Sequence, residues 1–185
     1  SAPAMDFAAL IYHRQEFLDG QWWLPLTAQL VHFSFPHALI NGAGAALLFV
    51  FFRPWLRGTS QWLALMGGWL AVAAMVVADA HCSYYAGASG ALQGWAAGGA
   101  LAMFRASGEH WDRRRWLGLS LLLLLLLKMW LLPHMTATDL SWGVPVYQPA
   151  HWAGTVGGLL FVGMWTLSFA TSQKQRADPQ RAEHQ

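Results

Sequence analysis

The sequence predicts an all-α membrane protein in which several helices cross the bilayer and pack as a bundle. Hydrophobic residues make up 56% of the 185-residue chain and charged residues 11%, whereas soluble domains carry about 25% charged residues. Five apolar stretches approach the ~20 residues that a helix needs to cross a membrane. The length suits one compact domain.

The chain divides into three parts. Residues 1–30 mix charged residues with aromatics, including Trp22 and Trp23, which indicates a periplasmic or interfacial lead-in. Residues 31–171 hold the predicted transmembrane domain, and residues 172–185 are polar and expected to form a disordered cytoplasmic tail. The predicted spans cover residues 35–52 (or 37–52), 61–78, 89–104, 116–132 and 149–170.

Positive charge predicts how the spans are oriented. With five spans, nine basic residues of two loops and the tail fall on one side of the membrane, which the positive-inside rule makes cytoplasmic. They are Arg53, Arg57, Arg105, Arg113, Arg114, Arg115, Lys174, Arg176 and Arg181. The lead-in and the loops at 79–88 and 133–149 then face outward, and an outward N-terminus is what we expect if a further helix precedes Ser1. Lys128 lies near the end of its span, so we expect its side chain to snorkel outward.

Glycines recur on one face of the third span and on one face of the fifth. They are Gly90, Gly94 and Gly98 in the third and Gly154 and Gly158 in the fifth. Small residues at this spacing let helix backbones approach closely in a membrane. Both helices run inward from the outer side, so packing their glycine faces together brings Ser89 beside His151. The third span has a length of about 24 Å against a hydrocarbon core of ~30 Å, which places Ser89 below the membrane surface.

Four polar side chains therefore converge near the outer ends of three spans. A neutral His151 can take the Ser89 hydroxyl proton as the serine attacks a carbonyl. His37, Asn41 and the Ser89 backbone N–H can donate hydrogen bonds to the oxyanion. No Asp or Glu is expected in this recess, so the prediction is a Ser–His dyad. The alternatives are that Ser89 is an ordinary helix N-cap and that the histidine only links two helices.

Other chemistries are less favoured by the residue pattern. His32, His37 and His151 could hold a metal ion, but no pair of them has the i, i+4 spacing, so neither a metal nor another cofactor is expected. Cys82 is the only cysteine, which excludes an internal disulfide. The net charge is +2 and the arginines cluster in loops, so nucleic acid is not an expected partner. The expected partners are membrane lipid and transmembrane protein segments.

These residues resemble the rhomboid intramembrane serine proteases. The resemblance covers about residues 21–170 and lies in HFSFPHALIN with His32, His37 and Asn41, in GASG with Ser89, and in AHWAG with His151, in the family's order. It implies a rhomboid-like bundle in which Ser89 is the nucleophile, His151 the general base, and His37 and Asn41 the oxyanion donors. His32 matches a position that is more structural than chemical.

Within that family, the chain looks most like the rhombosortase subgroup. The compact form, the lead-in segment GQWW at 20–23 and Gln93 four residues after the serine carry this likeness. It implies a serine endopeptidase of the bacterial inner membrane, open to the periplasm, that cleaves exported proteins at a C-terminal sorting tail of Gly-Gly, apolar helix and basic residues (GlyGly-CTERM). The alternative is an inactive relative that binds transmembrane clients, and a transporter is a weaker third possibility.

Three features depart from the family pattern. The usual Trp-Arg pair of the first outer loop is Trp23-Leu24. Gln93 replaces the aromatic residue that commonly packs on the catalytic histidine. The family's first transmembrane helix has no counterpart among the five predicted spans.

Overall fold

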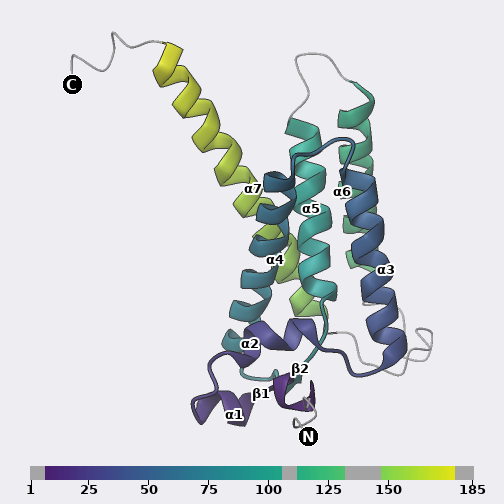
Figure 1. The fold of residues 1–185 in the computed structure, drawn as a ribbon, viewed down its shortest axis with the longest axis vertical. Helices are drawn as coiled ribbons and strands as arrows, with labels where there is room; N and C mark the ends of the chain where they lie inside the picture. The colour runs from purple at the N-terminus through teal and green to yellow at the C-terminus, as the bar shows by residue number, and fades with distance from the viewer. Residues whose placement is uncertain (1–6, 106–111, 132–146, 178–185) are drawn as a thin grey trace, which may run out of the picture.

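The computed structural model describes residues 7–105, 112–131 and 147–177, without the side chains of 167–177. Five long helices dominate it: α3 (Phe35–Phe52), α4 (Gly58–Ala78), α5 (Ser89–Arg105), α6 (Arg113–Leu131) and α7 (Gln148–Ala177) (Figure 1). They confirm the predicted all-α helical bundle.

The helix boundaries differ from the predicted spans mainly at the ends that the sequence predicts to be cytoplasmic. α3 matches its predicted range, whereas α4 and α6 begin earlier, at Gly58 and Arg113. α7 continues to Ala177 and so includes residues 172–177 of the predicted tail. Glutamine, lysine, arginine and alanine in this stretch have high helix propensity, which lets the helix outlast its apolar part. Residues 178–185 lie outside the described part.

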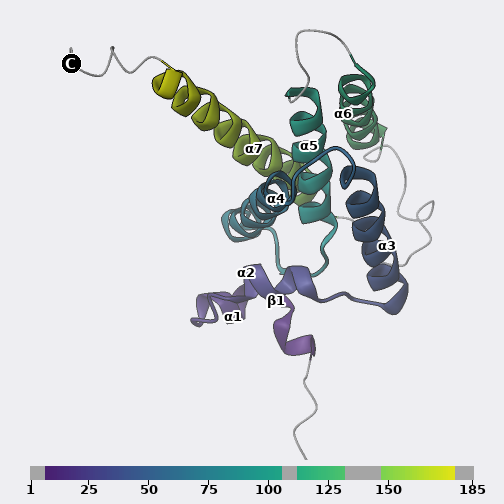
Figure 2. The ribbon, with the colours of Figure 1, turned by 45° about the horizontal axis from the view of Figure 1, so that its top comes forward.

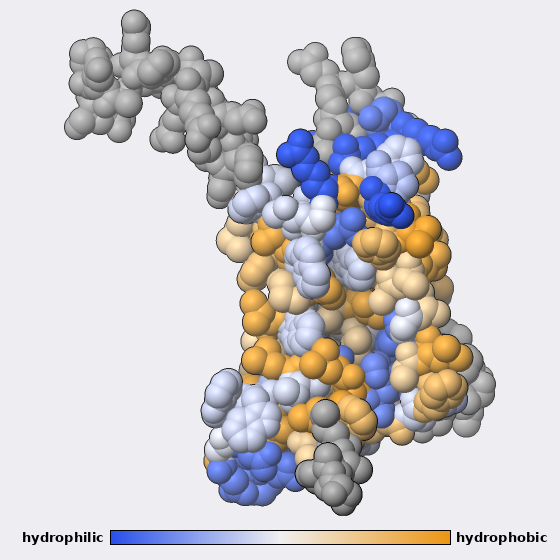
Figure 3. All heavy atoms as spheres, in the orientation of Figure 1, coloured by the Kyte–Doolittle hydropathy of each residue, from blue (hydrophilic) through white to orange (hydrophobic). Residues whose placement is uncertain are grey.

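The face of the bundle drawn in Figure 3 is mostly apolar between two more hydrophilic ends. α3 and α4 each meet the length and hydropathy of a membrane span, with mean hydropathies of 1.6 and 1.7. α5 has 17 residues and is shorter than α3 and α4. α6 begins with three arginines. The large exposed apolar side chains of the long helices include Leu39, Leu47, Val50, Trp62, Leu124 and Leu160. Such a surface suits contact with lipid acyl chains.

α5 is the central helix and is packed through its backbone. A Cβ added to Gly94 would lie 2.5 Å from the carbonyl oxygen of Gly154, and one added to Gly98 would lie 2.6 Å from that of Gly158. α4 approaches α7 in the same way, because a Cβ on Gly67 would lie 2.5 Å from the Gly157 oxygen. Helices α4, α5 and α7 therefore form a tight unit in which glycine is required at the contacts.

α3 is held less closely than these three helices. Its buried residues are Asn41 and Phe52, and it packs mainly against α5. Figure 2 shows α3 on the side of α5 away from α7. One wall of the bundle is thus a lightly packed helix.

The described part of the lead-in folds over the end of the bundle at which α5 begins (Figure 1). Its elements are a 3-10 helix (Phe7–Leu10), β1 (Tyr12–His13), α1 (Arg14–Leu18), α2 (Leu24–Thr27) and a second 3-10 helix (Ala28–Leu30). β1 pairs antiparallel with β2 (Tyr84–Tyr85), a ribbon that sequence pattern does not predict because two-residue strands have no readable period.

Hydrogen bonds and an apolar contact tie the lead-in to the bundle. Trp69 Nε1 donates to the carbonyl of Leu26 at 3.0 Å, and the Gly87 N–H donates to Ala28 at 2.9 Å. Leu24, at the position where the resemblance predicts an arginine, is fully buried in a cluster with Tyr12, Tyr85 and neighbouring residues of α4. The lead-in is thus anchored at this position by apolar contacts.

Candidate active site

Ser89 begins α5 directly after a turn that only glycine can make. Gly87 has a φ of +119°, and a Cβ there would lie 2.6 Å from Cε1 of His37. Both the left-handed backbone and the close approach exclude larger residues. Because the first N–H groups of a helix have no intrahelical partner, the turn leaves backbone donors beside the Ser89 hydroxyl.

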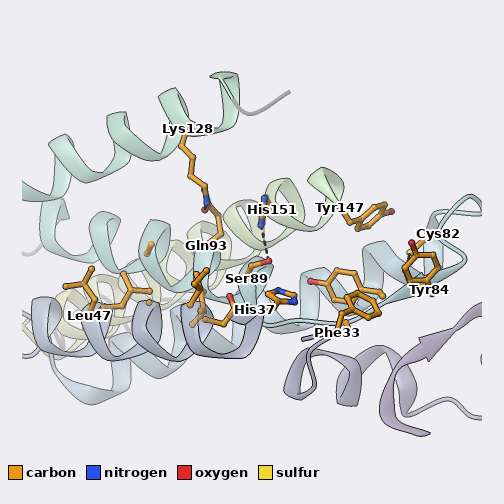
Figure 4. A pocket seen from close by; sticks show the side chains of 18 of the residues that line it. Phe33, His37, Leu47, Cys82, Tyr84, Ser89, Gln93, Lys128, Tyr147 and His151 are labelled. Atoms are coloured by element: carbon orange, nitrogen blue, oxygen red, sulfur yellow. Dashed lines mark hydrogen bonds between the residues drawn. The ribbon is translucent and has the colours of Figure 1, made fainter. Parts of the chain in front are cut away.

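Ser89 and His151 are joined by a hydrogen bond between helices. Ser89 Oγ lies 3.0 Å from His151 Nε2 (Figure 4), and His151 in the first turn of α7 is only 5% exposed. The Gly94–Gly154 and Gly98–Gly158 contacts of α5 and α7 bring the two helix starts together. The predicted neighbours are thus within proton-transfer distance.

Gln148 is a site residue that the sequence analysis missed. Its Oε1 lies 3.4 Å from His151 Nδ1. When Nδ1 carries the proton and donates to Gln148, Nε2 is free to accept the Ser89 proton. The spacing of three residues to His151 within one helix is the signal that could have identified it.

His37 and Asn41 face the turn before Ser89 from α3. Ser34 caps this helix, because the His37 N–H donates to Ser34 Oγ at 3.3 Å. Within the described residues, His37 Nδ1 and Asn41 Nδ2 are buried without a hydrogen-bond partner. Both residues line the same cavity as Ser89 and His151. The four residues predicted for the site therefore surround one space.

His32 lies behind His37 and does not line this cavity. The two rings meet edge to face, with centroids 4.9 Å apart. Burial, and secondarily the neighbouring His37, lowers the pKa of His32 below its usual value. In the described ranges, no group of three His, Cys, Asp or Glu residues is placed to hold a metal ion. His32 thus supports the orientation of His37.

The cavity has a volume of about 660 Å³ and runs along α3, α5 and α6. Its lining includes Phe33, His37, Ile40, Asn41, Leu47, Tyr84, Ser89, Leu92, Gln93, Lys128, Tyr147 and His151. Contrary to the prediction that Lys128 snorkels outward, its Nζ donates to Gln93 Oε1 at 2.9 Å. The reason is that Lys128 projects from α6 toward α5, where Gln93 offers its ammonium group a hydrogen-bond acceptor.

A tyrosine–aspartate pair fixes the start of α7. The Tyr147 hydroxyl donates to Asp79 Oδ2, just beyond α4, and the His81 N–H donates to Asp79 Oδ1 at 2.9 Å. These hydrogen bonds, that of Tyr147 first, hold the pKa of Asp79 below its usual value, while burial and then Asp79 raise the pKa of Tyr147. This pair ties the start of the helix that carries His151 to α4.

The family comparison agrees with this arrangement. The family model of the Rhomboid domain matches residues 19–168, most of the chain. No curated protein and no solved structure is significantly similar to it. Rhomboid proteins are multi-pass membrane proteins, and the family comprises intramembrane serine proteases that act on transmembrane substrates, together with inactive relatives. The match over residues 19–168 and the rhomboid-like bundle make this chain a member of the rhomboid family.

Proposed function

We propose that this chain is an active intramembrane serine endopeptidase that works with a Ser89–His151 dyad. The observation that carries the proposal is the 3.0 Å contact between Ser89 Oγ and His151 Nε2 beside a cavity of about 660 Å³. An ordinary N-cap serine would bond to its own helix. A serine bonded to a buried histidine of another helix is instead typical of a nucleophile and its base.

The acylation half of the reaction follows from these positions. His151 Nε2 takes the hydroxyl proton while Ser89 Oγ forms a bond to the scissile carbonyl carbon. The oxyanion that forms receives hydrogen bonds from His37, Asn41 and the Ser89 backbone N–H. His151 then gives its proton to the leaving nitrogen, the C–N bond breaks, and an acyl ester remains on Ser89.

Deacylation reverses these roles with water. His151 takes a proton from a water molecule as its oxygen attacks the ester, and returns that proton to Ser89 Oγ as the ester bond breaks. No carboxylate has to take part. Gln148 serves as the hydrogen-bond acceptor that orients His151.

The proposed substrate is a C-terminal transmembrane tail of the GlyGly-CTERM type, as the resemblance to rhombosortases implies. Two glycines at the outer end of a tail disfavour helix, which allows the backbone to extend beside Ser89. The proposed location is the bacterial inner membrane with the site open to the periplasm. In support, Ser89 begins α5 and Arg105 ends it, so the basic loops lie at the end of the bundle opposite the nucleophile.

The direct test is Ser89→Ala in cells that also express a protein with such a tail. We expect processing to stop while the variant still accumulates in membranes, and mass spectrometry of the wild-type product to identify the new C-terminus. Ser120→Ala, an exposed serine of α6, is the matched control and should process normally. Undiminished processing by Ser89→Ala would reject the dyad.

An inactive, client-binding relative is the other outcome of this test. A fluorophosphonate probe distinguishes it, since the probe should form an adduct on Ser89 of the wild-type protein only if the serine is activated. A folded wild-type protein that is never labelled would indicate a binding role.

A further inference from the structure

We propose that Gln93, held in place by Lys128, forms a donor subsite for a backbone carbonyl of the substrate about two residues from the cleaved bond. The inference rests on the proposed function, because it requires an extended peptide beside Ser89. It assigns a role to Gln93, which stands in place of the aromatic residue that is common in the family.

The hydrogen bond from Lys128 fixes the orientation of the Gln93 amide in the wall of the cavity. Lys128 Nζ lies 2.9 Å from Gln93 Oε1, and an ammonium group can only donate. The amide oxygen therefore faces Lys128, and the NH₂ group is the free end. Gln93 is 4% exposed, and its Nε2 is buried without a hydrogen-bond partner among the described residues. Figure 4 shows Lys128 reaching from α6 to Gln93 next to the Ser89–His151 pair.

The position of Gln93 sets the distance at which it would bind. It follows Ser89 by one helical turn, a rise of about 6 Å at ~1.5 Å per residue. An extended peptide advances about 3.3 Å per residue. A chain whose scissile carbonyl meets Ser89 thus presents a carbonyl to Gln93 about two residues away. In the proposed orientation this carbonyl lies on the deeper, leaving-group side of the cut.

The chemistry of the wall favours an acceptor as the ligand. Gln93 Nε2 and Asn41 Nδ2 are buried donors without partners among the described residues, and Lys128 has further N–H groups. No aspartate or glutamate lines the cavity in the part of the chain that the structure describes. A substrate that unwinds inside the bilayer exposes carbonyl oxygens, each costing several kcal/mol unless it is paired. Gln93 can supply that pairing.

Lys128 is a positioning residue in this arrangement. Its ammonium holds the Gln93 oxygen and so directs the amide N–H groups toward the substrate. Removing Lys128 should weaken the subsite only while Gln93 is present.

The test compares Gln93→Met, Lys128→Met and the double variant of the full chain in detergent. The substrate is a reporter fused to a transmembrane C-terminal segment with Gly-Gly at its outer end and a basic tail. We expect Gln93→Met to lower kcat/KM about 10- to 100-fold, the range for leaving a buried acceptor unpaired. Its cut should also spread over neighbouring peptide bonds, as mass spectrometry would show. Lys128→Met should have a smaller effect, and none in the Gln93→Met background.

Two controls separate this role from folding and from the dyad. Fluorophosphonate labelling of Ser89 should proceed at the wild-type rate in every variant, because the small probe does not reach Gln93. Gln93→Glu keeps a partner for Lys128 but removes the N–H donors, so it should reproduce the loss if Gln93→Met folds poorly. Leu124→Met, an exposed position of α6, should change nothing.

Each other outcome overturns the inference. The inference is rejected if Gln93→Met and Gln93→Glu both keep full activity and cut at one unchanged site. It is also rejected if Ser89 is labelled more slowly in these variants than in wild type. Lys128→Met could instead affect only substrates that carry an acidic residue near the cut. That result would mean that the Lys128 ammonium binds a substrate side chain and does not position Gln93. A wild-type protein that is labelled but cuts no fusion also rejects the subsite, whereas one that is not labelled rejects the proposed function itself.

Discussion

In the proposed dyad, Gln148 takes the place that a carboxylate has in a catalytic triad. A neutral amide oxygen 3.4 Å from Nδ1 orients His151 without adding negative charge. We expect Gln148→Leu to lower kcat about 10-fold with KM unchanged, because the acceptor that favours the productive tautomer is lost. Gln148→Glu keeps an acceptor and should retain most of the activity. Equal losses in both variants would mean that Gln148 acts on helix packing rather than on His151; steady-state cleavage of a tailed fusion protein measures both constants.

Some individual residues can be predicted from the sequence and others cannot. Ser89 and His151 stand out because their glycine faces predict which helices pack together. The direction of Lys128 depends on how α6 is rotated, and an unbroken leucine run from 121 to 127 has no polar face that would reveal it. Gln148 lies just before the predicted start of its span at residue 149, so the predicted helix does not include it.

At the scale of helices, glycine contacts should dominate stability. Gly94→Ala places a Cβ 2.5 Å from the Gly154 oxygen and from Gly68 Cα, and we expect it to destabilise the fold by about 1–3 kcal/mol. It should also separate Ser89 from His151 and reduce fluorophosphonate labelling. Gly42→Ala on α3 is the matched control, because nothing lies within 4 Å of its Cβ. Thermal unfolding in detergent measures both, and similar melting temperatures would contradict backbone packing at Gly94.

The Tyr147–Asp79 pair predicts a pH-dependent link between α4 and α7. The hydrogen bond from Tyr147 lowers the pKa of Asp79 in the folded protein. Ionised Asp79 therefore stabilises the fold above its unfolded pKa of about 3.9, and this stabilisation disappears as the pH falls through the lower pKa of the folded protein. The melting temperature of Tyr147→Phe should therefore lie below that of wild type at neutral pH and approach it in acid. In an Asp79→Asn background the effect of Tyr147→Phe should not vary with pH. If the difference in melting temperature between wild type and Tyr147→Phe stays constant across the acid range, this linkage is excluded.

The architecture was more predictable than the details of its elements. Apolar length predicts the long helices, and the glycine repeat predicts the neighbours of α5. The β1–β2 ribbon and the buried role of Leu24 depend on contacts between residues 12–24 and residues 72–85. Such long-range packing has no local signature in either segment.

For the whole molecule, the orientation in the membrane can be tested with cysteines. Ser83→Cys at the end that carries the site should react with a membrane-impermeant maleimide added from the periplasm, whereas Thr59→Cys in the basic loop region should not. Both side chains are exposed. Cys82 is 4% exposed and burial raises the pKa of its thiol, so background labelling should be low. The reverse pattern would place the site toward the cytoplasm.

The backbone contacts between α5 and α7 also bear on how the protein responds to its lipid environment. Helices adapt to a thicker or thinner bilayer by tilting, which alters distances between groups on loosely packed helices. The Ser89–His151 distance is set where Gly94 and Gly98 touch Gly154 and Gly158, inside the protein. The Ser89–His151 pair should keep its spacing when acyl-chain length changes, leaving α3, which is the least tightly packed, to absorb the mismatch.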